Sequence, residues 1–166
     1  MQGKVTLPDL MKRNASRLLA VATSITAVLI VLIALAPLGL YALGLSNVDG
    51  RPNPPSSSHP TPADVALLAR TFRTSKPITV EPLSPWAYVS FILEDPKRAA
   101  AEGGVDAAWV IARQYNAHHL EKRSSTWWHL SGAALTIWIT KHWTSDQVLS
   151  AAAALVRQSD SSRPKS

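Results

Sequence analysis

The sequence predicts an all-α protein, in which one N-terminal transmembrane helix is followed by a small helical domain of four or five helices. The stretch from Leu18 to Leu45 carries no charge and is dominated by Leu, Ile, Val and Ala. Roughly 20 such residues are enough for a helix to cross the hydrocarbon core of a bilayer. Beyond residue 61, helix-capping residues recur ahead of apolar residues three and four positions apart, which is the pattern of amphipathic helices.

Composition divides the 166 residues into five segments. The segments are a basic cytoplasmic tail (1–17), the transmembrane helix (18–45), a linker rich in Pro and Ser (46–61), a helical extracytoplasmic domain (62–157) and a disordered polar tail (158–166). The linker composition favours an extended, polyproline-like chain, so we expect a spacer that lifts the domain off the bilayer.

The charges that flank the apolar segment predict its direction across the membrane. Lys and Arg are concentrated before the segment, whereas only Arg51 follows closely behind it. Because positive charge is retained on the cytoplasmic side, we expect the N-terminus inside and the domain periplasmic or extracellular, with the protein in the inner (cytoplasmic) membrane. Tyr41 would then lie near an interface. The alternative is a cleaved secretory signal, with Ala42 and Gly44 as cleavage-site residues.

The helices of the domain are marked by their caps. Thr61, Pro62 and Asp64 form a capping box with proline at the first helical position, and Lys76-Pro77 ends that helix. The further predictions are an extended connector (Ile78–Leu83), a short helix (Trp86–Leu93), a helix capped by Asp106 after a Gly103-Gly104 turn (Ala107–Leu120), an apolar core helix (Trp127–Trp143) and a helix with a Thr144/Gln147 capping box (Ser145–Arg157).

Several classes of chemistry find no support in the sequence. The absence of cysteine excludes disulfides and thiolate metal sites. The net charge of +6 is spread along the chain, which favours an anionic membrane surface over nucleic acid as a partner. His118 and His119 do not have the spacing of zinc hydrolases, so we expect no metal and no cofactor. Ser131-Gly132 lacks a nucleophile-elbow pattern and is better suited to close helix packing.

All six tryptophans follow the proline- and serine-rich segment. They fall at apolar positions of the expected helices, so we expect them mainly in the core, with a place at the membrane interface as the alternative. They are Trp86, Trp109, Trp127, Trp128, Trp138 and Trp143.

The order of these features resembles the start of the peptidoglycan glycosyltransferase (transglycosylase) domain family. After a basic tail and one membrane helix come Leu83-Ser84-Pro85, Glu94-Asp95 and Gly104-Val105-Asp106, in the order of the family's first motif. The stretches Trp127–Leu130 and Lys141–Leu149 are similar to the family's later helix pair.

The resemblance implies roles for residues around the acidic pair. Glu94 matches the general base that deprotonates the attacking sugar hydroxyl, and the neighbouring Asp95, Lys97 and Arg98 would bind substrate. The family's following Phe falls on Arg98, and its Gly-Gly-Ser-Thr-Ile-x-Gln-Gln motif is absent. The resemblance therefore implies a degenerate, truncated relative without turnover.

Three functions follow from these observations. The favoured one is a membrane-anchored, non-catalytic interaction or scaffold domain of the bacterial cell envelope, with the lipid bilayer and other envelope or membrane proteins as partners. The second is a transglycosylase-like protein that binds peptidoglycan or lipid-linked glycan through Glu94. The third is a small subunit of a larger membrane complex, in which Trp127–Trp143 packs on a partner.

Overall fold

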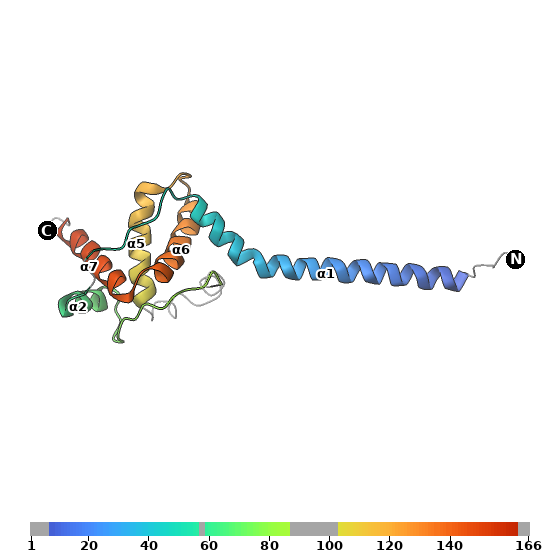
Figure 1. The fold of residues 1–166 in the computed structure, drawn as a ribbon, viewed down its shortest axis with the longest axis horizontal. Coiled ribbons are helices and arrows are strands. Elements are labelled where there is room, and N and C mark those ends of the chain that lie inside the picture. The colour runs from blue at the N-terminus through green and yellow to red at the C-terminus, as the bar shows by residue number, and fades with distance from the viewer. Residues whose placement is uncertain (1–6, 57–58, 87–102, 163–166) are drawn as a thin grey trace. The chain divides into compact units, whose positions relative to one another are not determined.

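The computed structural model describes residues 7–56, 59–86 and 103–162, with side chains from residue 21 onward. The chain divides into two units, Met1–Ala36 and Pro37–Ser166. The predicted all-α class is confirmed, because the described residues form five helices and no strand (Figure 1). The helices are α1 (Leu7–Ser46), α2 (Pro62–Thr71), α5 (Gly103–His119), α6 (Ser125–His142) and α7 (Ser145–Ser161).

Helix α1 is long and apolar enough to cross a membrane. Its apolar part, Val21–Ser46, has 26 residues, which exceeds the number that the hydrocarbon core requires. In the first unit its large side chains are exposed, with Ile30 and Ile33 at 62% and 70%. A helix that is apolar on all sides and not covered by protein is suited to a lipid environment. Length and composition alone do not separate a membrane anchor from a signal sequence.

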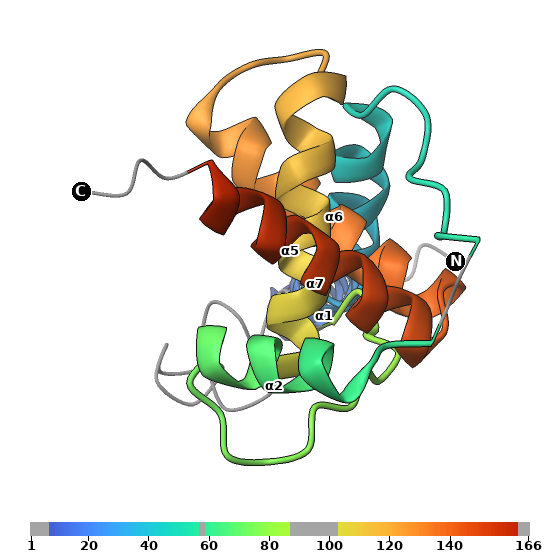
Figure 2. The same ribbon diagram turned by 90° about the vertical axis from the view of Figure 1, so that its left-hand side faces the viewer.

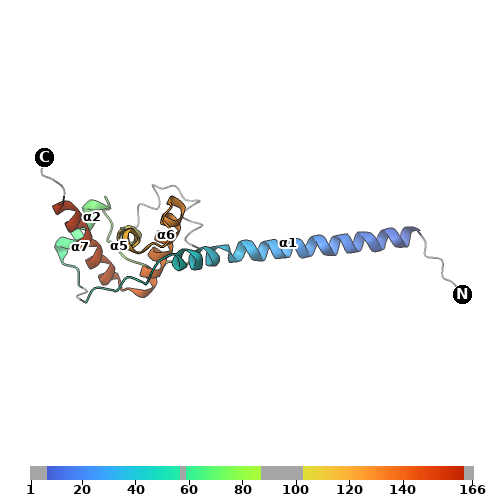
Figure 3. The same cartoon turned by 90° about the horizontal axis from the view of Figure 1, so that it is seen from above.

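Helix α5 occupies the centre of the second unit. It packs against α6 on one side and α7 on the other, and α2 packs on α7 (Figure 2). Seen from above, α5 lies between α6 and the pair formed by α7 and α2 (Figure 3). The main core gathers Leu68 from α2, Ile111 from α5, Leu135 and Ile139 from α6, and Val148 from α7.

Helix α6 is the buried core helix that the sequence predicts. Leu135, Ile137 and Ile139 are fully buried although they point to different sides of the helix. Leu135 and Ile139 belong to the main core, whereas Ile137 packs in a second cluster on the opposite side. Its apolar perimeter is therefore covered within this chain.

The capping residues act as the sequence predicts at two helices. Thr61 accepts a hydrogen bond from the Asp64 backbone N–H at 3.2 Å, and the Asp64 carboxylate accepts one from the Thr61 N–H at 3.0 Å. Thr144 and Gln147 form the same reciprocal pair at the start of α7. These bonds satisfy backbone N–H groups that the first helical turn leaves free.

Helix α5 begins at Gly103, so the predicted turn at Gly103-Gly104 and cap at Asp106 are wrong. A Cβ on Gly104 would lie 2.0 Å from the carbonyl oxygen of Thr79, so glycine is needed where the connector crosses the helix start. Asp106 lies instead within the first turn. The glycines permit close packing rather than a reversal of the chain.

Two other helix ends differ from the prediction by a few residues. Helix α7 continues to Ser161, beyond the predicted end at Arg157 and into the segment expected to be a tail. Helix α2 ends at Thr71, before Lys76-Pro77, because Arg73 adopts a left-handed conformation with φ of 54°. Past Trp86, the predicted helix Trp86–Leu93 lies outside the described residues.

The tryptophans divide between core and surface. Trp143 is 7% exposed and belongs to the main core. Trp128 and Trp138 are partly buried and pack against this core cluster. Trp86 is 49% exposed. The core prediction is therefore confirmed for Trp143, Trp128 and Trp138, whereas the indole ring of Trp86 is exposed.

Candidate functional site

The last turns of α1 are part of the helical domain. Gly44 is buried against α6, and a Cβ there would lie 2.7 Å from both the Ala134 Cβ and the Leu130 carbonyl oxygen. Tyr41 and Leu45 pack beside it on the cluster formed by Ala134 and Ile137. The apolar helix therefore ends in a contact with the domain and not in a free chain.

Asn47 fixes the chain immediately after α1. Its side chain is 3% exposed and accepts a hydrogen bond from the Lys122 N–H at 3.0 Å. The amide of the same side chain donates to Ser131 Oγ at 3.3 Å and to the Lys122 carbonyl at 3.4 Å. A buried polar side chain is costly unless its groups are hydrogen-bonded, so this residue specifies one arrangement of α1 against the α5–α6 loop.

Backbone contacts continue this attachment. Val48 pairs with Leu120 as an isolated antiparallel bridge, and the Asp49 N–H donates to the His119 carbonyl at 2.9 Å. Tyr115 donates its hydroxyl to the Asp49 carbonyl at 3.0 Å and stacks on His119 with ring centroids 3.9 Å apart. The start of the predicted linker therefore lies on the domain.

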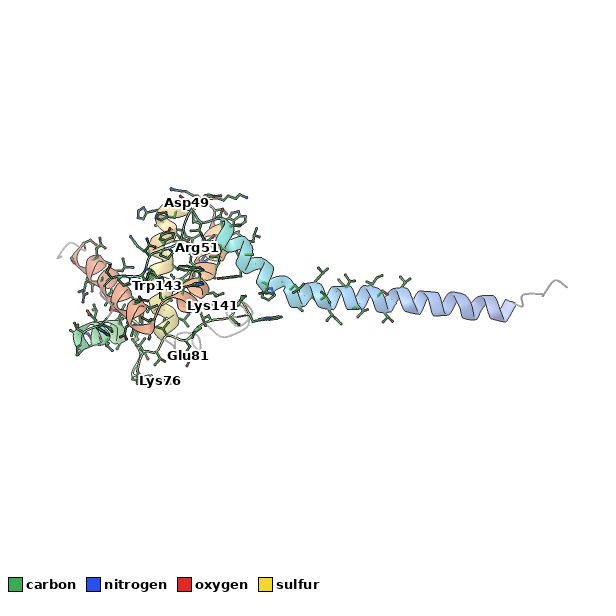
Figure 4. All side chains as sticks on the ribbon, viewed as in Figure 1. Asp49, Arg51, Lys76, Glu81, Lys141 and Trp143 are labelled. Carbon is green, nitrogen blue, oxygen red and sulfur yellow. The ribbon has the colours of Figure 1, made fainter. Side chains whose placement is uncertain are left out.

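Burial raises the pKa of the Tyr115 hydroxyl above its ordinary value, and the Asp49 carboxylate adds to that effect. Arg51 opposes it. Both charges that shift the pKa of Tyr115, those of Asp49 and Arg51, belong to the segment just after α1, where Figure 4 labels them. A raised pKa favours the neutral hydroxyl, which is the form that donates to the Asp49 carbonyl.

The connector between α2 and α5 is held on the same domain by two hydroxyl groups. The Val80 N–H donates to Ser145 Oγ at 3.2 Å, and the Leu83 N–H donates to Thr140 Oγ1 at 3.1 Å. The Leu83 side chain then joins the cluster that contains Tyr41 and Leu45. The connector is thereby brought to the last turns of α1.

A basic and aromatic group lies at the same place. The Lys141 ammonium lies 6.0 Å from the ring centroid of Tyr41, a cation–π distance. One residue further, His142 stacks on Trp138 with centroids 4.4 Å apart. Figure 4 shows Lys141 near the last turns of α1, away from Lys76.

An open cleft of about 480 Å³ lies elsewhere in the domain, between α5, α7 and the segment after α1. Its walls include Tyr115, His118, His119 and Trp143. The buried indole N–H of Trp143 has no hydrogen-bond acceptor among the residues that the structure describes. This cleft combines aromatic and imidazole surfaces, which can contact either an apolar or a hydrogen-bonding group.

The residues that the sequence assigns to a substrate site are not placed by the structure. Glu94, Asp95, Lys97 and Arg98 all lie outside the described residues. Within the described ranges, no group of three His, Asp or Glu side chains converges as a metal site would require. The structure instead brings together Gly44, Asn47 and Ser131, which sequence reasoning did not connect.

The signal for this junction was present but ambiguous. Two interpretations follow from the sequence: Gly44 is a possible cleavage-site residue, and Ser131-Gly132 is a place of close packing. The second interpretation is confirmed, because a Cβ on Gly132 would lie 2.9 Å from the Trp109 ring. Nothing in the spacing of Gly44 and Asn47 names α6 as their partner. Comparisons with protein-family models, curated proteins and solved structures return no match to this chain.

Proposed function

We propose that this chain is a membrane-anchored, non-catalytic interaction module. In this proposal α1 crosses the cytoplasmic membrane, the basic tail stays in the cytoplasm, and the helical domain lies on the opposite face and binds other envelope or membrane proteins. The observation that carries the proposal is the continuity of α1 with the domain. The last turns of α1 pack on α6, and Asn47 directly after them is hydrogen-bonded to the same folded domain.

This packing supports retention of the helix over cleavage as a signal. Cleavage beside Ala42 or Gly44 would remove Tyr41 from the cluster on α6 and cut the helix where it is held. A secretory signal has no such role in the mature domain. The mature fold therefore gains packing from residues that a cleaved signal would lose.

The basic residues ahead of the span support the direction of insertion. The positive-inside tendency places Lys4, Lys12, Arg13 and Arg17 in the cytoplasm. The alternative, binding of lipid-linked glycan through Glu94, depends on a residue outside the described ranges, and no described contact favours it.

Single-cysteine labelling tests anchoring and direction together, because the natural chain has no cysteine. We would introduce Thr6→Cys or Ser161→Cys into the full chain and treat intact cells with a membrane-impermeant maleimide. Ser161→Cys should react in intact cells, and Thr6→Cys only after lysis. The product should retain its full mass and stay in the membrane pellet after carbonate extraction.

Four results would contradict the proposal. Release of the protein by carbonate would contradict anchoring by α1. A mature chain that begins near residue 43 would identify a cleaved signal. Reaction of Thr6→Cys but not Ser161→Cys in intact cells would reverse the direction. Affinity purification of the full chain from solubilised membranes then tests the interaction role, and failure to recover a stoichiometric protein partner would contradict that part.

A further inference from the structure

Exposed large apolar side chains in the second unit are confined to a few positions. Among the described residues of Pro37–Ser166 they are Leu38, Leu40, Leu43 and Trp86, with exposed fractions between 39% and 49%. Three of them lie on the last turns of α1. Soluble domains leave single apolar residues exposed, but a group confined to one place indicates a contact surface.

Trp86 belongs to this place through the connector. Leu83 packs in one cluster with Tyr41 and Leu45 of α1. Trp86 is three residues further along, and a fully extended chain of that length spans only about 10 Å. The backbone of Trp86 therefore lies within about 10 Å of Leu83, which packs in the cluster that includes Tyr41, and the Tyr41 ring lies 6.0 Å from the Lys141 ammonium.

A count along the sequence places the membrane boundary at the same residues. Arg17 is the last charged residue before the apolar stretch. About 20 helical residues cross a hydrocarbon core that is about 30 Å thick. Counted from Leu18, the crossing is complete at about Pro37, which is where the second unit begins. Leu38, Leu40 and Tyr41 then fall in the interfacial layer.

We propose that the last turns of α1 around Leu38, Leu40 and Leu43 lie in the lipid headgroup layer together with Trp86 and Lys141, so that the domain rests on the bilayer surface. The partner is the bilayer surface, with the Trp86 indole among the headgroups and the Lys141 ammonium beside lipid phosphates. Trp and Tyr prefer this layer, and a lysine ammonium is attracted to lipid phosphates. This inference rests on the proposed membrane anchoring.

This direct placement of the domain on the headgroups, called the seat below, replaces the spacer that the linker composition predicts. Asn47 and Val48 are already buried on the α5–α6 loop, so the proline- and serine-rich segment starts after helix and domain have met. In this proposal the segment therefore does not act as a spacer between the bilayer and the domain. The nearby connector carries one described acidic residue, Glu81. Figure 4 shows it farther from the last turns of α1 than Lys141.

Site-specific fluorophores on the full chain in lipid nanodiscs test this seat. Single cysteines at Trp86 and Lys141 would be labelled, and phospholipids with a nitroxide on the headgroup would quench labels that lie near the surface. Ala66→Cys on α2 and Gln158→Cys on α7 are matched controls at exposed positions, because α5 and α6 lie between these helices and the last turns of α1 (Figure 1). We expect at least threefold stronger quenching at residues 86 and 141 than at the two controls.

The outcomes separate this inference from the anchoring on which it rests. A label at Ala27→Cys, quenched by nitroxides on the acyl chains, would show that the helix is inserted. Weak quenching at all four domain positions in such a sample would mean that the domain stands off the bilayer and would overturn the seat alone. Stronger quenching at residues 66 and 158 would assign a different face. Absence of quenching at Ala27→Cys would overturn the anchoring itself.

Discussion

Helices α1 and α6 are both apolar on most of their circumference, yet their surroundings are opposite. In α6, Leu135, Ile137 and Ile139 are completely buried by the rest of the domain. In α1, Val28, Ile30 and Ile33 are between 58% and 70% exposed. A helix that is apolar on all sides therefore needs an apolar environment. Whether protein or lipid provides that environment depends on what the rest of the chain packs against the helix.

Length and polar residues distinguish the two helices. With 18 residues, α6 is at the short limit for a crossing, whereas the apolar part of α1 has 26. The hydroxyl groups of α6 are also used within the domain, since Thr136 donates to the Gly132 carbonyl and Thr140 accepts from the Leu83 N–H. A core helix can carry such groups because its neighbours provide hydrogen-bond partners.

The largest effect should come from placing a charge in α6. Leu135→Arg buries an unpaired cation in the main core, which should lower the free energy of unfolding by more than about 4 kcal/mol. Tryptophan fluorescence during urea titration of the full chain in nanodiscs measures this, because all six tryptophans belong to the domain. A cooperative transition near that of the natural chain would contradict the core assignment.

The same charge in α1 should leave folding of the domain intact and impair insertion. Leu29→Arg introduces a cation at a position that is 52% exposed, near the middle of the expected span. Its cost on insertion scales is about 2.5–3.5 kcal/mol. We expect the carbonate-resistant fraction to fall markedly, while the urea midpoint of purified, reconstituted protein stays the same. Unchanged membrane retention would place α1 outside the bilayer.

Two glycines at the far end of α1 sharpen the contrast within one helix. Gly44 faces α6, where a methyl group would meet Ala134 and Leu130, whereas nothing lies within 4 Å of the corresponding position on Gly39. Gly44→Ala should destabilise the domain by about 1–3 kcal/mol through overpacking. Gly39→Ala should be neutral or stabilising by up to about 1 kcal/mol. Equal urea midpoints for the two variants would argue against the packing of α1 on α6.

A smaller effect is expected at the contact between α2 and α7. Asp64 is almost buried, closes the capping box with Thr61, and pairs with Arg157. Asp64→Ala should lower the free energy of unfolding by about 1–2 kcal/mol. The pair of Asp146 and His59 is exposed at both ends, so Asp146→Ala should cost less than about 1 kcal/mol. Reversal of this order in urea titrations would contradict the assignment.

The sequence predicted those parts of the fold that local chemistry determines. Both capping boxes and the buried apolar helix α6 follow from neighbouring residues, and the structure confirms them. The predicted start of α5 is wrong because Gly104 serves close packing against the Thr79 carbonyl, and that contact is remote in sequence. For the same reason the contacts of Gly44 and Asn47 could not be predicted. The Glu94 interpretation stays a prediction, since that residue lies outside the described ranges.

The smallest effect concerns Asp106, where two influences on one carboxylate oppose each other. Burial raises its pKa above the ordinary value, whereas its place in the first turn of α5 favours the charged form. A raised pKa in the folded state means that the contribution to stability is full below the unfolded pKa and is lost as pH rises through the folded one. Asp106→Asn should therefore raise the urea midpoint slightly at pH 7 and leave it unchanged near pH 3. Asp160→Asn, at an exposed position, controls for the lost charge. A lower midpoint for Asp106→Asn at pH 7 would mean that the helix dipole outweighs burial.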